Sequence, residues 1–283
     1  MATVRVKSYA KLNLTLHITG VNGGYHMLDS LVTSVDLYDL ITVKKRKDKL
    51  ISITMHGQGS ESIPFEENNA VKAGELFVEK YGTCGADITV YKNIPMGLGL
   101  GGSSADSAGV LNALKKLYKI NDLAGIKLIA DETGSDTRYM LTGGYARLFG
   151  RGDEVKAIES KLKLDFLLLA PKDRVSTGKC FSLFDKSGNF GGNSDFAESA
   201  VIAGDKLGLA RQMTNSLTAP AVELAPDIGK AISDLKDFDP LAVNMTGSGS
   251  GVYALFENAE FCEYAKSRYR GNCAVYRLKT KIL

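Results

Sequence analysis

The sequence has few cysteines, and none is placed to form a metal site. Of its 283 residues only four are cysteine, and no two of them form a C-x-x-C pair or stand close to a histidine. They are Cys84, Cys180, Cys262 and Cys273. This spacing argues against a zinc site. Unpaired cysteines are typical of a reducing compartment, so we expect a cytoplasmic protein.

Long apolar runs and a strong charge of one sign are also missing. No apolar stretch approaches the ~20 residues that span a bilayer. The N-terminus passes directly into strand-like sequence without the regions of a signal peptide. The formal net charge is only +3, with both signs spread along the chain. We therefore expect neither a membrane nor a nucleic-acid partner, although a small positive excess would suit an anionic small molecule.

What the sequence does contain is typical of an ordinary globular protein. It is 44% hydrophobic and 24% charged, and its length allows one large domain or two of medium size. Strand and helix patterns mix without strict alternation, which predicts the α+β class. We place a domain boundary near residue 155, giving domains at residues 1–155 and 156–283.

Alternating side chains predict a strand over residues 10–18. The apolar face would carry Ala10, Leu12, Leu14, Leu16 and Ile18. The polar face would carry Lys11, Asn13, Thr15 and His17. A period of two with one apolar face is the pattern of a half-buried strand.

The same patterns predict the other elements. Strand-like stretches cover residues 31–43, 50–55, 86–92, 143–149, 164–170, 251–256 and 273–279. Helical spacing covers residues 69–81, 103–118, 196–213 and 226–235. The basic run at residues 44–49 stands between two strand-like stretches, and we interpret it as the tip of a hairpin.

The strongest chemical signal is a glycine-rich loop that leads into a helix. Glycines allow backbone N–H groups to wrap a phosphate, and the N-terminus of the following helix adds donors and a positive dipole end. Ser103 and Ser104 could reach phosphate oxygens, and Ser104 could also reach a bound Mg²⁺. Ser103 and Asp106 have the spacing of a capping box. The predicted nucleotide-binding residues are Pro95, Met96, Gly97, Leu98, Gly99, Leu100, Gly101, Gly102, Ser103, Ser104 and Ala105.

Two better-known glycine motifs fit this loop less well. Gly97, Gly99 and Gly102 satisfy G-x-G-x-x-G, and Asp122 follows at about the distance that a dinucleotide fold requires. However, Pro95 separates the loop from its strand, and residues 110–121 look helical where a second strand is needed. A Walker A motif is excluded because no Gly-Lys-Ser/Thr follows. A plain glycine-rich turn is the remaining alternative.

Several motifs along the chain together resemble the GHMP kinases, the superfamily of galactokinase, homoserine kinase, mevalonate kinase and phosphomevalonate kinase. The glycine loop resembles their phosphate loop. Further motifs narrow the resemblance to the diphosphocytidyl-methylerythritol kinases and follow that family's order over nearly the full chain. They are Ala10-Lys11-Leu12-Asn13-Leu14, Gly24-Tyr25-His26 with residues 28–41, Gly134-Ser135-Asp136, Val175-Ser176-Thr177-Gly178, Asn215-Ser216-Leu217 and Met245-Thr246-Gly247-Ser248-Gly249.

The resemblance implies a fold, an activity and a set of site residues. The fold would have a ribosomal-protein-like N-terminal domain and a ferredoxin-like C-terminal domain. The activity would be ATP- and Mg²⁺-dependent phosphorylation of the 2-hydroxyl of 4-diphosphocytidyl-2-C-methylerythritol, in the non-mevalonate route to isoprenoid precursors. Asp136 would be the catalytic base and Lys11 its cationic partner. The substrate would be bound by Asn13, Tyr25, His26 and Thr177.

The sequence departs from the family pattern beside the predicted base. Thr137-Arg138-Tyr139 stands where the family usually has Val-Pro-Phe, and Arg138 could pair with Asp136 or contact a phosphate. In the loop, Ser103 replaces the third glycine and Ala105 the second serine. Two alternatives therefore remain: a GHMP kinase for a different alcohol, or a catalytically weak nucleotide-binding homologue.

Overall fold

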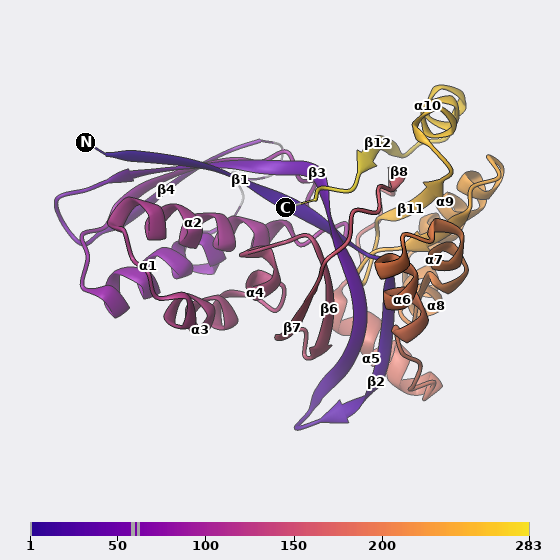
Figure 1. Ribbon diagram of the computed structural model, residues 1–283, viewed down its shortest axis with the longest axis horizontal. Coiled ribbons are helices and arrows are strands. Elements are labelled where there is room, and N and C mark those ends of the chain that lie inside the picture. The colour runs from indigo at the N-terminus through magenta and orange to yellow at the C-terminus, as the bar shows by residue number, and fades with distance from the viewer. Residues whose placement is uncertain (1, 58–59, 61–62, 283) are drawn as a thin grey trace. The chain divides into compact units, whose positions relative to one another are not determined.

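The chain forms two compact units of mixed α and β structure, as the α+β class predicts. The computed structural model describes residues 2–57, 60 and 63–282 (Figure 1). The first unit comprises Met1–Ala10, Leu37–Met96 and Gly101–Gly143. The second comprises Lys11–Asp36, Gly97–Leu100 and Gly144–Leu283.

The units are not consecutive stretches because two long strands continue from one unit into the other. These are β1 (Thr3–Asn13) and β3 (Tyr25–Lys45). The linear domain boundary near residue 155 stays a prediction.

The first unit packs helices against a sheet. The sheet includes β4 (Ile51–His56), β5 (Ala86–Tyr91) and the end of β3, with β5 between the other two. Figure 1 shows the helices of this unit gathered along one side of these strands. They are α1 (Asn69–Tyr81), α2 (Gly102–Tyr118), α3 (Leu123–Thr133) and α4 (Thr137–Met140), preceded by the 3-10 helix η2 (Phe65–Glu67). The core between these layers includes Phe77, Ile41, Ile88, Val110 and Leu114.

The hairpin predicted at the basic run is wrong. β5 pairs antiparallel with residues 40–45 of β3 and parallel with β4, so β3 and β4 are not neighbours. Arg46 contributes to the connection through ion pairs with Asp48 and Asp87, each with an N–O distance of 2.6 Å. These charged residues therefore link the adjacent ends of β3, β5 and β4 instead of forming the tip of a hairpin between β3 and β4.

Capping residues in the sequence explain both ends of helix α1, but they do not explain the start of α2. The Asn68 side chain accepts from Ala70 N at 3.0 Å, and Gly82 ends α1 with φ 61°. These are the start and stop residues that a helix prefers. The capping box predicted for Ser103 and Asp106 is wrong. The N-cap of α2 is Gly101, and Asp106 forms an ion pair with Lys92 instead.

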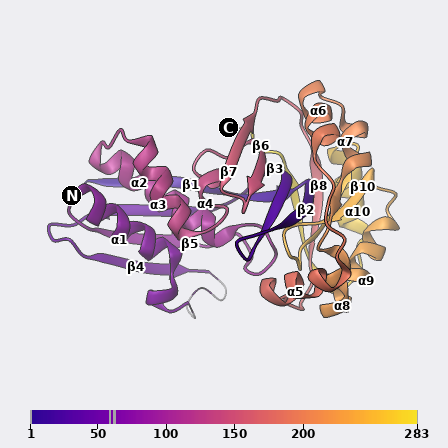
Figure 2. The same cartoon turned by 90° about the horizontal axis from the view of Figure 1, so that it is seen from below.

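The second unit contains a four-stranded antiparallel sheet in the order β10-β11-β8-β12. The strands are β8 (Asp165–Ala170), β10 (Ala242–Met245), β11 (Val252–Phe256) and β12 (Ala274–Lys279). Helix α9 (Pro226–Lys236) precedes β10, α10 (Ala259–Arg268) precedes β12, and both pack on this sheet (Figure 2). This β-α-β-β-α-β arrangement confirms the ferredoxin-like expectation for the C-terminal part.

The remaining strands of the second unit surround the first part of β3. They are β2 (Thr15–Asn22), β6 (Tyr145–Gly150), β7 (Glu154–Ile158) and β9 (Thr214–Asn215). The half-buried strand predicted over residues 10–18 is wrong in two respects. The chain breaks at Leu14 into β1 and β2, and both faces are buried, with Lys11 4% and Asn13 3% exposed.

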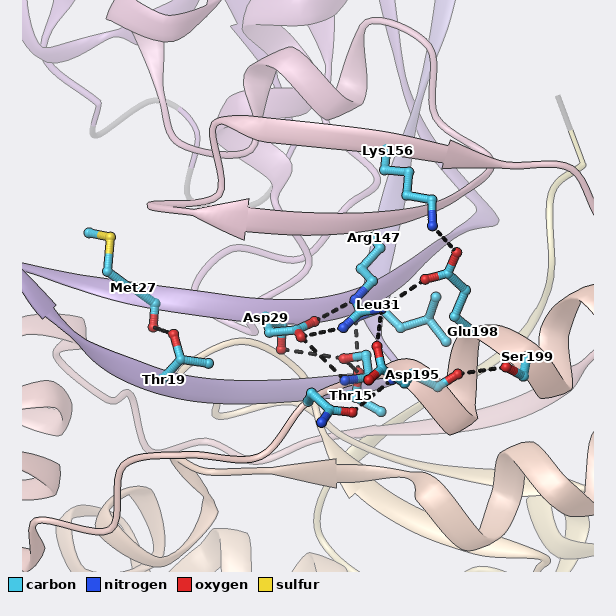
Figure 3. A network of polar contacts seen from close by, with 12 residues as sticks. Thr15, Thr19, Met27, Asp29, Leu31, Arg147, Lys156, Asp195, Glu198 and Ser199 are labelled. Atoms are coloured by element: carbon cyan, nitrogen blue, oxygen red, sulfur yellow. Dashed lines mark hydrogen bonds and ion pairs between the residues drawn. The ribbon is translucent and has the colours of Figure 1, made fainter.

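Helix α6 (Asp195–Ala203) is held to these strands by a buried ionic network. Arg147 on β6 donates to Asp29 on β3 and to Asp195 and Glu198 on α6 (Figure 3). Burial alone would raise the pKa of Asp29, but hydrogen bonds from Arg147 and Ser194 outweigh it and lower the pKa. The other helices of the unit are α5 (Thr177–Ser187), α7 (Lys206–Gln212) and α8 (Thr218–Leu224). Among the described residues, no helix has the length and apolar character needed to cross a bilayer.

Candidate functional site

The glycine loop passes through both units. Its middle, Gly97–Leu100, belongs to the second unit, and the residues on either side belong to the first. Gly97, Gly99 and Gly101 all have φ between 70° and 73°, the left-handed region that glycine adopts without strain. The sequence therefore encodes the path of this loop through its glycines, and the wrapping of a phosphate by their N–H groups stays a prediction.

In the second unit, the loop packs directly on the predicted Met245–Gly249 motif. A Cβ atom built on Gly99 would lie 2.1 Å from the carbonyl oxygen of Thr246. The Thr246 hydroxyl donates to Gly99 O at 3.1 Å, and Ser250 N donates to Gly97 O at 3.3 Å. The motif is therefore more than a simple turn, since it fixes the backbone of the loop.

Asn13 connects the motif at residues 10–14 to the glycine motif at residues 245–249 through hydrogen bonds. Its Oδ1 accepts from Lys11 Nζ at 2.6 Å and from Gly247 N at 2.9 Å, and its Nδ2 donates to Ser30 Oγ at 2.9 Å. Lys11 N also donates to Leu100 O in the loop at 3.1 Å. The structure thus brings together three motifs that lie far apart in the sequence. A contact between Asn13 and the acceptor alcohol stays a prediction.

In the first unit, the loop ends at an uncapped helix start. The first hydrogen bond of α2 runs from Ala105 N to Gly101 O, at 2.8 Å, and no side chain caps the helix. The N–H groups of Gly102, Ser103 and Ser104 therefore have no intrahelical acceptor. Such groups, together with the helix dipole, favour a bound anion.

The predicted base and the predicted metal ligand lie on adjoining segments of the first unit. Asp136 stands directly before α4, and its side chain does not cap that helix. A Cβ atom built on Gly134 would lie 2.8 Å from Ser104 Oγ, so the Gly134–Asp136 turn lies against the start of α2. Lys11 belongs to the other unit, and its pairing with Asp136 stays a prediction.

Arg138, the departure beside the predicted base, has a carboxylate partner in the first unit. Its Nε donates to Asp131 Oδ1 at 2.6 Å, and its Nη2 pairs with Asp131 Oδ2. This bidentate contact ties α4 to α3. The Asp131 contact thus gives Arg138 a structural role in this unit.

A buried ionic triad behind the loop was missed by sequence reasoning. Lys92 Nζ pairs with Asp39 Oδ2 and, at 2.6 Å, with Asp106 Oδ2 on α2. Asp39 Oδ1 accepts from the backbone N–H groups of Asn93 and Ile94, just before the loop. Burial raises the pKa of Asp106 well above its ordinary value. The triad anchors the chain on both sides of the glycines. Its three residues follow no fixed spacing in the sequence from which it could have been predicted.

Tyr25 and His26 begin strand β3 after a turn at Gly23 and Gly24. Tyr25 is 57% exposed, and the Arg151 guanidinium lies 4.7 Å from the centroid of its ring. His26 Nε2 lies 2.6 Å from Asp185 Oδ1 on α5, and the imidazole packs 4.5 Å from the Phe181 ring. Because a carboxylate only accepts, Nε2 carries the proton and Nδ1 is the nitrogen left for another partner.

Thr177 lies at the start of α5, where its hydroxyl meets the glycine motif of the same unit. Its Oγ1 is 2.9 Å from Ser248 Oγ. The structure therefore groups Lys11, Asn13, Thr177 and Gly97–Leu100 around residues 246–250. The roles of these residues in binding and catalysis stay predictions.

Comparison with known proteins gives a consistent family match. Models of the GHMP kinases N terminal domain and of the GHMP kinases C terminal match residues 68–144 and 197–269. A 4-diphosphocytidyl-2-C-methyl-D-erythritol kinase of Caldanaerobacter subterraneus subsp. tengcongensis is 36% identical, over 91% of this chain and 89% of that protein. The kinase of the same name from Caldicellulosiruptor saccharolyticus is 34% identical, over 89% of this chain and 88% of that protein.

Solved structures support the same fold. A crystal structure of a 4-(cytidine 5'-diphospho)-2C-methyl-D-erythritol kinase matches with a TM-score of 0.82 and 26% identity, covering 98% of each chain. A homoserine kinase from Cytophaga hutchinsonii matches with a TM-score of 0.77 and 17% identity, covering 100% of this chain and 95% of that one. At that identity the second match shows the fold alone.

Proposed function

This chain belongs to the GHMP kinases, and from that membership we propose that it phosphorylates the 2-hydroxyl of 4-diphosphocytidyl-2-C-methyl-D-erythritol with ATP. The observation that carries the proposal is similarity over about nine-tenths of the chain to relatives of that name. The reaction would belong to the non-mevalonate route to isoprenoid precursors. The cytoplasmic location expected from the cysteines stays a prediction.

The loop residues suit the binding of ATP phosphates. Three N–H groups at the start of α2 lack intrahelical acceptors, and the preceding glycines leave the backbone open to an anion. The Ser104 hydroxyl, on the first turn of α2, would help to hold Mg²⁺ bound to the nucleotide. A divalent cation neutralises the charge that develops on the transferred group.

Phosphoryl transfer depends on positioning and on charge more than on covalent chemistry. We assign Asp136 the role of base for the acceptor hydroxyl. Lys11 would keep that carboxylate ionised and stabilise the transferred phosphoryl group. Lys11 suits this role because it is buried and oriented by a 2.6 Å hydrogen bond to Asn13 instead of extending into solvent.

A direct assay tests the proposal. Purified protein with Mg²⁺ and ATP should convert the cytidine substrate, with the product phosphorylated at the 2-hydroxyl by ³¹P NMR. Mevalonate and homoserine serve as comparison substrates. Equal or better turnover of either would overturn the substrate assignment, and no turnover of any alcohol would favour the nucleotide-binding homologue.

Nucleotide protection separates the kinase from a dinucleotide-dependent enzyme. A ligand that binds only the folded state raises the melting temperature. ATP should therefore raise the melting temperature, and NAD should not. Protection by NAD without protection by ATP would contradict the phosphate-loop interpretation.

A further inference from the structure

An arginine with no assigned role lies against the middle of the glycine loop. A Cβ atom built on Gly97 would lie 3.0 Å from Cδ and 3.3 Å from Nη1 of Arg174. Arg174 stands between β8 and α5, three residues before Thr177, and it belongs to the same unit as Gly97. The Arg174 side chain therefore lies beside Gly97, on the side where this residue has no Cβ.

The Arg174 guanidinium makes no contact among the described residues that would stabilise the fold. It is exposed, and within residues 2–57, 60 and 63–282 it makes no hydrogen bond or ion pair. The other arginines of the second unit include Arg147, whose guanidinium is buried among three carboxylates. An arginine that stabilises the fold would show such partners, and Arg174 shows none.

The surroundings of Arg174 supply further donors for an anion. The first hydrogen bond of α5 runs from Cys180 N to Ser176 O at 2.9 Å, and Ser176 makes no side-chain cap. The N–H groups of Thr177, Gly178 and Lys179 therefore have no intrahelical acceptor. The Thr177 hydroxyl, paired with Ser248, adds another polar group at this helix start.

We propose that Arg174 binds the oxygens of a nucleoside diphosphate group beside Gly97. A planar guanidinium donates two parallel hydrogen bonds to phosphate, and such charge-assisted bonds are about twice as strong as neutral ones. Because Gly97 has no side chain, the guanidinium and the loop backbone can face the same oxygens. The proposal rests on the proposed function, in which both ATP and the cytidine substrate carry a diphosphate.

Binding experiments with Arg174→Ala test the assignment. Calorimetry should show ADP, CDP or both binding about 10- to 100-fold more weakly, the loss expected for a charge-assisted hydrogen bond. Adenosine and cytidine, which lack phosphates, should bind as before. Arg174→Lys keeps the charge but not the fork and should give an intermediate loss.

Kinetics assign the diphosphate to its source. A rise in the KM for ATP alone places ATP phosphates at Arg174, and a rise in the KM for the cytidine substrate alone places that diphosphate there. Lys172→Ala is the matched control, since it removes an exposed charge two residues away. It should change each dissociation constant by less than about twofold.

Either of two results would overturn the proposal: changes of less than about twofold in every dissociation constant of Arg174→Ala, or an equal loss in Lys172→Ala. Both results can be told apart from a failure of the proposed function. The ADP measurements do not require the cytidine substrate. Conversely, an Arg174→Ala variant that turns over that substrate with unchanged KM values for both ATP and the cytidine substrate would remove Arg174 from the site and leave the function standing.

Discussion

At the scale of single residues, the chemistry depends on side chains whose ordinary position would be the surface. Lys11 and Asn13 lie on what the sequence predicts to be the solvent face of a strand, yet both are buried. Burial is tolerated because Asn13 accepts from Lys11 and Gly247 and donates to Ser30. A buried polar group without such partners would cost stability.

The proposed catalytic pair can be tested by two nearly isosteric changes. Asp136→Asn removes the base but keeps its size, and should lower kcat by about 10²–10⁴-fold, the usual contribution of general base catalysis. Lys11→Met removes the charge and should also lower kcat strongly. Steady-state kinetics and circular dichroism would check that activity falls while the fold persists. A near-normal kcat in either variant would contradict the pair and require another basic group.

Specificity for cytosine is predicted to depend on Tyr25 and His26. Tyr25→Ala should raise the KM for the cytidine substrate by about 10- to 100-fold, following the energy of base stacking on an aromatic ring. The effect should fall on KM more than on kcat, because stacking stabilises ground and transition states alike.

His26→Ala should narrow the preference for the cytidine substrate over a uridine analogue. The physical reason is that the bond from Nε2 to Asp185 leaves Nδ1 to read the base edge. Asp185→Asn is the matched variant, because it perturbs His26 without removing the ring. Changes in stability alone, with KM and base preference unaltered, would show that these residues only form the start of a strand.

At the scale of elements, the glycine loop works because two backbones approach closely. Gly99→Ala would place a Cβ 2.1 Å from Thr246 O. We expect the loop to shift and the KM for ATP to rise by at least about tenfold, as misplacement of a positioning group can cost that much. The measurement is ATP kinetics beside thermal melting.

Gly204→Ala is the matched control for this loop. Gly204 has the same φ as Gly99, 72°, but nothing within 4 Å of a built Cβ. It should lose about 1–2 kcal/mol of stability through backbone strain alone and keep its KM. Equal kinetic effects in the two variants would refute a role for the close approach.

The buried ionic network determines how α6 attaches to the strands. Arg147→Met would leave Asp29 buried without its cation, whereas Glu198 would keep its pair with Lys156. We expect a loss of about 3–5 kcal/mol in the free energy of unfolding, measured by urea titration. Arg151→Met removes an exposed ion pair, in which Arg151 Nη2 lies 3.9 Å from Asp153 Oδ2. This variant should lose at most about 1 kcal/mol in the free energy of unfolding. Similar losses in both variants would mean that the network adds no special stability.

At the scale of the whole molecule, the same network predicts how stability depends on pH. Burial favours a higher pKa for both Asp29 and Glu198. For Asp29, hydrogen bonds from Arg147 and Ser194 outweigh burial and lower the pKa below its ordinary value of 3.8. For Glu198, hydrogen bonds from Lys156 and Arg147 lower the pKa below its ordinary value of 4.5. Such groups bind fewer protons in the folded than in the unfolded state. Their contribution is complete above about pH 5 and is lost as the pH falls through the folded pKa values.

Urea unfolding at several pH values would measure this dependence. The free energy of unfolding of the natural protein should fall as the pH drops below about 5. In Arg147→Met the fall should be shallower, because Asp29 and Glu198 lose the bonds from Arg147 that help to lower their pKa, while Ser194 and Lys156 still lower them. Parallel curves for the two proteins would show that other groups control acid unfolding.

Much of the local structure could be predicted from the sequence. Helix α1 has the predicted bounds because Asn68 and Gly82 mark its ends. In the ferredoxin-like part, the apolar pattern located β8, β11, β12 and α9 but missed β10 and α10. The predicted helix over residues 103–118 matches α2 to within one residue, and only its cap was wrong. Asp106, three residues after Ser103, has the spacing of a capping partner, but its carboxylate pairs with Lys92.

By itself, the sequence determined the backbone of the loop, the limits of helices such as α1 and the ordered motifs of a GHMP kinase. These features depend on φ preferences and on neighbours along the chain. Tertiary structure decided that the polar side of residues 11–15 is buried, that β5 lies between β3 and β4, and that Arg147 reaches Asp29 across 118 positions. It also placed Arg174 against Gly97. Contacts between residues so far apart are set by the order in which strands pair, and neither periodicity nor spacing records that order.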